Sequence, residues 1–232
     1  MIKPKKLKLG DTIGIVAPGS PTTEEKVEKA YEKLKEMGFK VKLGKSCYSK
    51  YGYLAGRDEL RAEDLNSMFR DTEVDGIICL RGGYGTIRIL EFLDYNLIRA
   101  NPKVFVGYSD ITAIHIAINQ ISNLVTFHGP MAASDLAGDI SKFSLESLFN
   151  SILHEDFDGN LKNPTEELIT INGGVAEGQI IGGNLSLIAS TIGTPYEIDT
   201  KGKIIFIEEI GEEPYRIDRM LNQLKLSNKL QE

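Results

Sequence analysis

The stretch that decides the fold expected for this chain is Val104-Phe105-Val106-Gly107-Tyr108-Ser109-Asp110-Ile111-Thr112. An apolar run typical of a buried strand leads through Gly-Tyr-Ser directly into residues 111–118, whose apolar spacing predicts a helix. A tight turn from strand to helix lifts a serine above the edge of a sheet and points the following amide at an oxyanion. Because Ile111 replaces the second glycine of the usual Gly-x-Ser-x-Gly pattern, a helix N-cap stays open as a second interpretation of Ser109.

On both sides of this stretch, short apolar runs alternate with amphipathic segments. Strands are predicted at residues 13–17, 39–43, 74–80, 104–106 and 124–127, and helices at 24–37, 57–69, 86–93 and 111–118. This alternation predicts an α/β fold, with a mainly parallel sheet flanked by helices. Ligands of such sheets bind beyond the carboxyl ends of the strands, which selects the loops at residues 18–21, 81–85 and 107–110.

The chain changes in composition after residue 150. An α/β domain is predicted over residues 1–150, a polar linker over 151–166, and an incomplete, smaller C-terminal unit over 167–232. In this unit, strands are expected at 168–171 and 203–207, and helices at 185–192 and 215–226. Its few short apolar runs make a marginal core, so we expect the unit either to lean on the first domain or to lack part of its own structure.

Composition argues against several classes of protein. The 232 residues are 41% hydrophobic and 26% charged, as in ordinary globular proteins, and the net charge of −6 argues against a nucleic-acid partner. Neither Cys47 nor Cys79 belongs to a CxxC pair, so we predict no disulfide framework and no metal site, and Cys79 is expected to be a buried thiol. No signal peptide and no stretch of ~18 apolar residues is found, so we expect a cytoplasmic protein without a membrane partner.

A glycine-rich turn, Arg81-Gly82-Gly83-Tyr84-Gly85, follows the predicted strand at 74–80. Glycines here let backbone amides approach a ligand closely, and in a hydrolase they could supply the second oxyanion donor. A phosphate-binding loop is the rival interpretation, but neither GxGxxG nor GxxxxGK[ST] is present. A purely structural turn stays open.

Carboxylates gather where the predicted strand at 203–207 ends, in Glu208-Glu209-Ile210-Gly211-Glu212-Glu213. Most such glutamates face water or begin a helix favourably. Glu208 is nearest to the strand, and is therefore best placed to project from a rigid element, as a group that orients a histidine must. The histidines are expected to have structural roles, because none stands where it would present an imidazole to the serine; they are His115, His128 and His154.

Together these segments resemble the LD-carboxypeptidase family of serine peptidases, which also includes the microcin C immunity peptidases. Six stretches carry the resemblance in family order: residues 15–20 (IVAPGS), 81–85 (RGGYG), 107–112 (GYSDIT), 126–130 (TFHGP), 182–185 (GGNL) and 208–219. The resemblance implies an enzyme that cleaves an amide between an L- and a D-centre. Its usual substrate is a murein tetrapeptide, which loses its terminal D-alanine during cell-wall recycling.

The family uses a Ser-Glu-His triad in that chain order, and no metal or other cofactor. Carried over, the resemblance implies Ser109 as the nucleophile and Glu208 as the group that orients the histidine, with Glu209 as the alternative. It implies an oxyanion hole built from the Gly82-Gly83 turn and the Asp110 amide. The partner that it implies is a small murein peptide, and it allows a homodimer.

The departure from the family pattern concerns the histidine of the triad. The family carries it in a glycine-flanked motif beyond residue 219, which this sequence does not contain, so a 232-residue chain is expected to have low activity. Two alternatives stay open: an immunity-type peptidase that hydrolyses a peptidyl-nucleotide antibiotic, and an inactive fragment that only binds peptides. A nucleotide-binding domain is rejected, because Leu43-Gly44-Lys45 stands where an acidic residue would grip a ribose.

Overall fold

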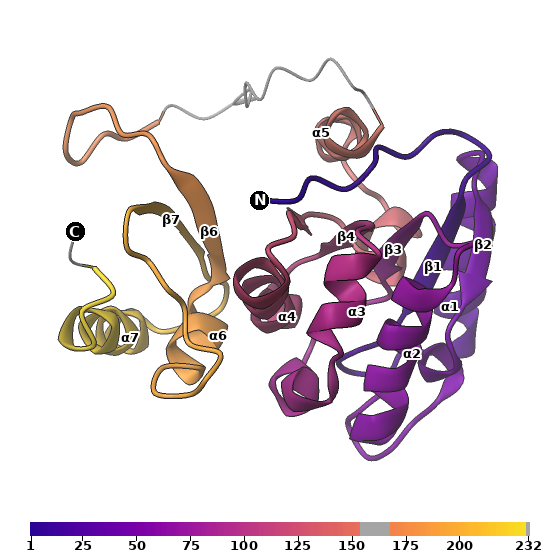
Figure 1. Ribbon diagram of the computed structural model, residues 1–232, viewed down its shortest axis with the longest axis horizontal. Helices are drawn as coiled ribbons and strands as arrows, with labels where there is room; N and C mark the ends of the chain where they lie inside the picture. The colour runs from indigo at the N-terminus through magenta and orange to yellow at the C-terminus, as the bar shows by residue number, and fades with distance from the viewer. Residues whose placement is uncertain (154–167, 231–232) are drawn as a thin grey trace.

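The computed structural model describes residues 1–153 and 168–230 of the chain. Two sheets organise these residues, a five-stranded sheet in the order β2-β1-β3-β4-β5 and a two-stranded sheet of β6 and β7 (Figure 1). Neighbouring strands in both sheets pair in parallel. The strands are β1 (Thr12–Val16), β2 (Lys40–Leu43), β3 (Gly76–Cys79), β4 (Val104–Gly107), β5 (Phe127–His128), β6 (Gln179–Asn184) and β7 (Lys203–Glu208).

Helices cover both faces of the larger sheet, and the predicted α/β architecture is confirmed. Residues of α1 and α5 share one buried cluster with the strands, and residues of α2, α3 and α4 share another. Figure 1 shows α2, α3 and α4 on the near side of the sheet. The helices are α1 (Glu24–Glu36), α2 (Asp58–Arg70), α3 (Tyr95–Ala100), α4 (Thr112–Ala117), α5 (Lys142–Ile152), α6 (Leu185–Ser190) and α7 (Pro214–Leu226).

The central strands are buried because their residues are apolar on both faces. β3 and β4 are buried along their whole length, whereas β2 alternates exposed lysines with half-buried apolar residues, as an edge strand does. On one face, α1 is capped by Thr23, whose hydroxyl accepts a hydrogen bond from the Lys26 amide, and it buries Val27, Ala30 and Leu34. The loops at the carboxyl edge are therefore held by a packed core.

The two-stranded sheet shares its core with the larger unit. Together with α6 and α7 it encloses a cluster of six buried apolar residues, one of which, Ile116, belongs to α4. Gln120 joins the units a second time, because its side chain accepts a hydrogen bond from the Asp199 amide (2.7 Å) and donates one to the Glu197 carbonyl (3.0 Å). The smaller unit therefore leans on the larger one, which was one of the two expectations.

The strand predicted at residues 168–171 is wrong. Leu168, Ile169 and Ile171 are 80%, 90% and 98% exposed, and among the described residues none of them pairs with β6, β7 or another strand. A run of residues with high β propensity forms a strand only where a neighbouring strand satisfies its backbone groups. The local pattern was therefore misleading here.

Smaller differences concern the ends and types of other elements. The helix predicted at 86–93 is a 3-10 helix over Thr86–Phe92. β5 is shorter than the predicted strand at 124–127, because Leu124 pairs with Ile2 in an isolated bridge. α3 and α5 were not predicted.

The predicted linker at 151–166 lies mostly outside the described residues, and α5 continues to Ile152. Within residues 1–153 and 168–230, none of the helices has the length and apolar character that crossing a membrane requires.

Candidate active site

The loops after β1 and β3 meet where the strand order reverses. β2 follows β1 in the chain and lies on one side of β1, whereas β3 lies on the other side of β1. Ligands of parallel sheets bind at such a reversal of strand order. Here the Ser20 amide donates to the Gly82 carbonyl (3.1 Å), and the Tyr84 amide donates to Ser20 Oγ (3.1 Å). The two loops therefore form one connected rim.

Ser109 stands on the turn between β4 and α4, at the carboxyl edge of the larger sheet. Its φ is 60°, a left-handed conformation that costs a residue with a side chain about 1–2 kcal/mol. The turn is tight, since a Cβ on Gly107 would lie 2.9 Å from the Ile111 side chain. The helix-cap positions fall on Tyr108 and Ile111, so the N-cap interpretation of Ser109 does not hold.

The turn of residues 107–111 that carries Ser109 is called the elbow below. The glycine turn of residues 81–85 packs directly against it. A Cβ on Gly82 would lie 3.4 Å from the Ser109 Cβ and 3.4 Å from the Asp110 nitrogen. Within the described part of the chain, the amides of Gly82, Gly83 and Asp110 donate to no backbone carbonyl. The structure thus brings the residues of the predicted oxyanion hole together and leaves their amides available.

The Asp110 side chain is part of the support beneath the elbow. It is 2% exposed, and its Oδ2 accepts a hydrogen bond from the Thr86 amide (3.1 Å). Burial raises the pKa of Asp110, although the hydrogen bonds from Thr86 and the charge of Arg61 oppose the rise. The carboxyl group therefore fastens the elbow to the residues that follow the glycine turn.

Arg61 is a residue of the site that the sequence did not reveal. Its side chain, on α2, is fully buried. Its Nη1 donates to the carbonyls of Pro18 and Gly85 (2.9 Å to Gly85), and its Nη2 pairs with Asp58. Arg61 thereby fixes the loop after β1 to the glycine turn. The available signal was a cation four residues before Leu65, on the apolar side of its helix.

The smaller sheet meets the larger one at the start of α4. At the end of β6, the Asn184 amide donates to Thr112 Oγ1 (3.0 Å), and a Cβ on Gly183 would lie 2.6 Å from the same oxygen. Because Gly183 has no Cβ, β6 can approach α4 this closely. Asn184 is paired in register with Glu208, so the end of β7 arrives near the elbow as well.

Glu209 is fully engaged in holding α6. It accepts hydrogen bonds from the Asn184 side chain (3.0 Å), the Ser186 amide (2.9 Å), the Ser186 hydroxyl (2.5 Å) and the Ile210 amide (3.0 Å). Burial opposes the ionisation of Glu209, but these hydrogen bonds together outweigh it and lower its pKa. The carboxylate has a structural task.

Glu208, in contrast, keeps an unused carboxylate oxygen. Its Oε1 is buried and has no hydrogen-bond partner in the described structure. Burial raises the pKa of Glu208, and the negative charge of Glu209 adds to the rise. Burial and Asp135 raise the pKa of Tyr108 to about 12, and Glu208 contributes as well. The charge of Glu208 is therefore felt by the residue that precedes Ser109.

His115 lies inside the larger unit. Its Nε2 is hydrogen-bonded to the Gly107 carbonyl (2.8 Å), and its ring packs edge-on against Phe105, with ring centroids 5.2 Å apart. Burial lowers the pKa of His115 to about 4. The ring therefore stays neutral and supports the elbow from within the packing, in keeping with its predicted structural role.

His128 lies between the two units, at the end of β5. Its ring centroid is 6.0 Å from that of Tyr108 and 5.1 Å from that of Phe206 on β7. The side chain is exposed, yet partial burial lowers its pKa. His128 thus belongs to an aromatic contact between the units. His154 lies outside the described residues.

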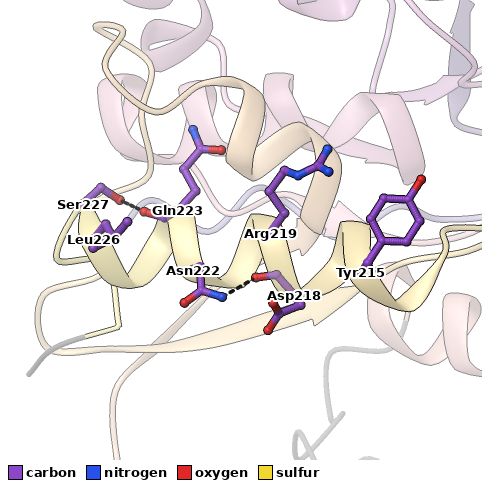
Figure 2. Close-up of a pocket in the computed structure, with 7 residues that line it drawn as sticks. All are labelled: Tyr215, Asp218, Arg219, Asn222, Gln223, Leu226 and Ser227. Carbon is purple, nitrogen blue, oxygen red and sulfur yellow. Dashed lines mark hydrogen bonds between the residues drawn. The ribbon is translucent and has the colours of Figure 1, made fainter.

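A shallow depression along α7 is separate from the elbow. Figure 2 shows that its lining residues come from this helix and from Ser227, which caps its end, with Arg219 beside the Tyr215 ring. None of the predicted site residues lines it; the lining consists of Tyr215, Asp218, Arg219, Asn222, Gln223, Leu226 and Ser227.

Two family models match the chain. The LD-carboxypeptidase N-terminal domain matches residues 13–129, and the LD-carboxypeptidase C-terminal domain matches residues 177–232. Between them they include every predicted site residue.

Known proteins are similar along nearly the whole chain. A probable murein peptide carboxypeptidase of Bacillus subtilis (strain 168) is 51% identical over 232 residues, which cover 98% of this chain and 71% of the relative. An MccF-like protein from Bacillus anthracis str. Ames matches with a TM-score of 0.89 and 30% identity, over 99% of this chain and 78% of that one. A muramoyltetrapeptide carboxypeptidase from Oxalobacter formigenes matches with a TM-score of 0.81 and 34% identity, over 94% of this chain and 72% of that one.

Proposed function

Because the chain belongs to the LD-carboxypeptidase family, we propose that it is a serine carboxypeptidase that releases D-alanine from a murein tetrapeptide during cell-wall recycling. The observation that carries the proposal is Ser109, held at a φ of 60° on a tight turn and packed against the glycine turn. The relatives from Bacillus subtilis and Oxalobacter formigenes support the choice of substrate, since both are named for murein peptides.

The proposed reaction needs the triad histidine that the family carries beyond residue 219 and that this sequence does not contain. Ser109 Oγ attacks the carbonyl carbon of the L,D-peptide bond while its proton passes to the imidazole of that histidine. The amides of the Gly82-Gly83 turn and of Asp110 stabilise the negative charge that develops on the carbonyl oxygen. The intermediate collapses to an acyl-enzyme when the C–N bond breaks and the departing amine of D-alanine takes up the proton. Water then attacks the acyl group, and the shortened peptide leaves.

Glu208 is proposed to orient the imidazole by accepting a hydrogen bond from its N–H. The buried Oε1 of Glu208, which has no partner among the described residues, supports this role, whereas Glu209 already accepts hydrogen bonds from Asn184, Ser186 and Ile210. His115 is not assigned as the base, because its Nε2 is already bonded to the Gly107 carbonyl. His128 is not assigned either, because its ring lies edge-on to Phe206 and tilted against Tyr108, in the contact between the units.

We propose the cytoplasm as the location of the enzyme. Cys47 and Cys79 are both buried and unpaired, as is usual where thiols stay reduced. Burial raises the pKa of Cys47 to about 12, so this thiol is unreactive.

The test is the release of D-alanine from a murein tetrapeptide. We expect a release that depends on Ser109, so that the Ser109→Ala variant falls to the background, and we expect Glu208→Gln to lose far more activity than Glu209→Gln. A low rate of D-alanine release is sufficient for this test, because the comparison requires only that the release depends on Ser109. Equal rates in the wild type and in Ser109→Ala would overturn the proposal.

A second candidate is an immunity-type peptidase, which the match to the MccF-like protein from Bacillus anthracis favours. Both candidates use the same serine, so they differ only in substrate. Rates measured on a murein tetrapeptide and on a peptidyl-nucleotide amide, at equal concentrations, separate them. We expect the tetrapeptide to be preferred, because the 51% identical Bacillus subtilis relative is named for murein peptides.

A further inference from the structure

Arg81 opens the glycine turn and carries a guanidinium group without a carboxylate partner. Its Nη1 donates to the Pro21 carbonyl (3.2 Å), and the side chain is half-buried. Among the residues that the structure describes, no aspartate or glutamate lies within salt-bridge distance of it. A half-buried arginine with free donors has lost part of its hydration without gaining an anion, which makes it ready to bind one.

Two other arginines at this edge of the sheet, Arg61 and Arg88, are already paired with a carboxylate, and a third, the exposed Arg57, lies over the Tyr51 ring. Arg61 is buried and contacts Asp58, and the exposed Arg88 donates to both oxygens of the same carboxylate, at 3.1 and 2.6 Å. Their charges are therefore balanced within the protein. Among the described arginines of this rim, Arg81 is the half-buried one that has no carboxylate partner, so it can receive a negative group from outside.

The position of Arg81 relates it directly to the nucleophile. Gly82, the next residue, packs against Ser109, and a Cβ on Gly83 would lie 3.6 Å from Arg81 Nη2 and 2.5 Å from Ser20 Oγ. The guanidinium group thus lies along the turn whose amides are proposed to form the oxyanion hole. A substrate carbonyl held by that turn would have its next few atoms close to Arg81.

We propose that Arg81 binds the terminal carboxylate of the peptide substrate, that is, the carboxylate of the D-amino acid that leaves. This inference rests on the proposed function. In a carboxypeptidase substrate the terminal carboxylate is only two bonds from the nitrogen of the scissile amide, so its binding group must adjoin the oxyanion hole. A guanidinium group binds a carboxylate through two parallel hydrogen bonds, which selects free chain ends over internal peptide bonds.

A local cation is also what the charge of this protein requires. The chain carries a net charge of −6, so its overall field repels a carboxylate. Specific attraction at the rim of the site has to overcome that repulsion. It would also make substrate binding weaker at high salt, where a partly exposed ion pair is screened.

The experiment compares two ligands by isothermal titration calorimetry, with Ser109→Ala as the background so that the peptide stays intact. The ligands are a murein tetrapeptide with a free terminal carboxylate and the same peptide as its terminal carboxamide. We expect the acid to bind at least tenfold more tightly than the amide. Adding Arg81→Gln should weaken the affinity for the acid at least tenfold and change the affinity for the carboxamide by less than threefold, so that the preference for the acid is lost. Adding Arg81→Lys instead should retain part of this preference.

Arg88→Gln is the matched control, because it removes a guanidinium group from the same rim that is already paired, and it should leave the preference unchanged. If Arg81→Gln keeps the preference for the acid, or weakens both ligands equally, the inference is wrong. If neither ligand binds even to the Ser109→Ala background, the proposed function itself fails, and Arg81 loses its role with it.

Discussion

The single guanidinium group of Arg61 ties two loops of the site together from below. The buried guanidinium group contacts the Pro18 and Gly85 carbonyls and pairs with the partly exposed Asp58. Arg61→Met should therefore lower the free energy of unfolding by about 1–3 kcal/mol, because the buried Pro18 carbonyl loses its donor, whereas Asp58 keeps the Arg88 side chain and the Gly85 carbonyl keeps the Arg88 amide. Urea unfolding followed by circular dichroism measures this change.

Arg70→Met on the same helix is the control for Arg61. Arg70 is exposed and pairs with Glu63 at 3.2 Å, and exposed pairs contribute about 0–1 kcal/mol. A loss of stability in Arg61→Met no larger than in Arg70→Met would show that the buried contacts do not hold the loops.

The ionised carboxylate of Glu208 is expected to lower the free energy of unfolding of the protein. Burial raises its pKa, so the folded state binds the proton more tightly than the unfolded state does. The ionised carboxylate therefore destabilises the protein above the raised pKa, and Glu208→Gln should be more stable than the wild type at pH 8, by about a few tenths of a kcal/mol for a half-exposed group. Below the ordinary value of 4.5, both states bind the proton and the difference should vanish.

Glu209→Gln is the matched comparison, and we expect the opposite sign. Glu209 accepts hydrogen bonds at the start of α6, so its replacement should cost about 1–2 kcal/mol at neutral pH. Unfolding measured between pH 4 and pH 8 gives both results. Equal effects of the two replacements would mean that the glutamates share one role.

Among the elements, β6 depends on a glycine for its approach to α4. Gly183 has a φ of +135°, and a Cβ there would lie 2.6 Å from Thr112 Oγ1. Gly183→Ala should cost about 1–3 kcal/mol, push the end of β7 away from the elbow, and lower D-alanine release at least tenfold. Unfolding and activity should be measured on the same preparation.

Gly202→Ala separates backbone strain from the clash. Gly202 also has a positive φ, +65°, but no atom lies within 4 Å of a Cβ built there. The Gly202→Ala variant should lose about 1 kcal/mol of stability and keep its activity. If both alanines reduce activity equally, the contact between β6 and α4 does not position Glu208.

The elements around Ser109 could be predicted because local and global signals agree there. β4 is apolar on both faces, and the Gly-Tyr-Ser turn that follows it marks the end of a buried strand. Glu208 and Glu209 could not be told apart in this way, since adjacent acidic residues look alike until hydrogen bonds to Asn184 and Ser186 occupy one of them. Arg61 escaped notice because an arginine on a helix is usually exposed.

The strand predicted at 168–171 failed for the complementary reason. Its side chains have strong β propensity, but pairing depends on a neighbouring strand, which sequence does not report. The 3-10 helix at Thr86–Phe92 likewise depends on a tertiary contact, the hydrogen bond from the Thr86 amide to Asp110. Both are properties of the folded surroundings.

For the molecule as a whole, the smaller unit exposes an unusual amount of apolar surface. Leu168, Ile169, Ile171, Ile180 and Ile210 are between 64% and 98% exposed. A two-stranded sheet also leaves both of its edges unpaired. We therefore expect the 232-residue chain to self-associate as its concentration rises, and sedimentation velocity measures this association.

The double variant Ile169→Ser with Ile171→Ser should weaken the association at least threefold without changing stability, because both side chains are almost fully exposed. Leu9→Ser, at a residue that is 69% exposed on the larger unit, is the control and should have no effect. If the double variant self-associates as strongly as the wild type, the surface that mediates association lies elsewhere.

The order of strands along the chain has a consequence for synthesis on the ribosome. All five strands of the larger sheet come from residues 12–128, so the turn that holds Ser109 can form once these residues have emerged. Glu208, the carboxylate proposed to act with it, ends β7, which is translated after all five of these strands. A growing polypeptide therefore acquires its nucleophile well before its acidic partner, and we expect nascent chains to stay inert toward peptides at least until β7 has emerged from the ribosome.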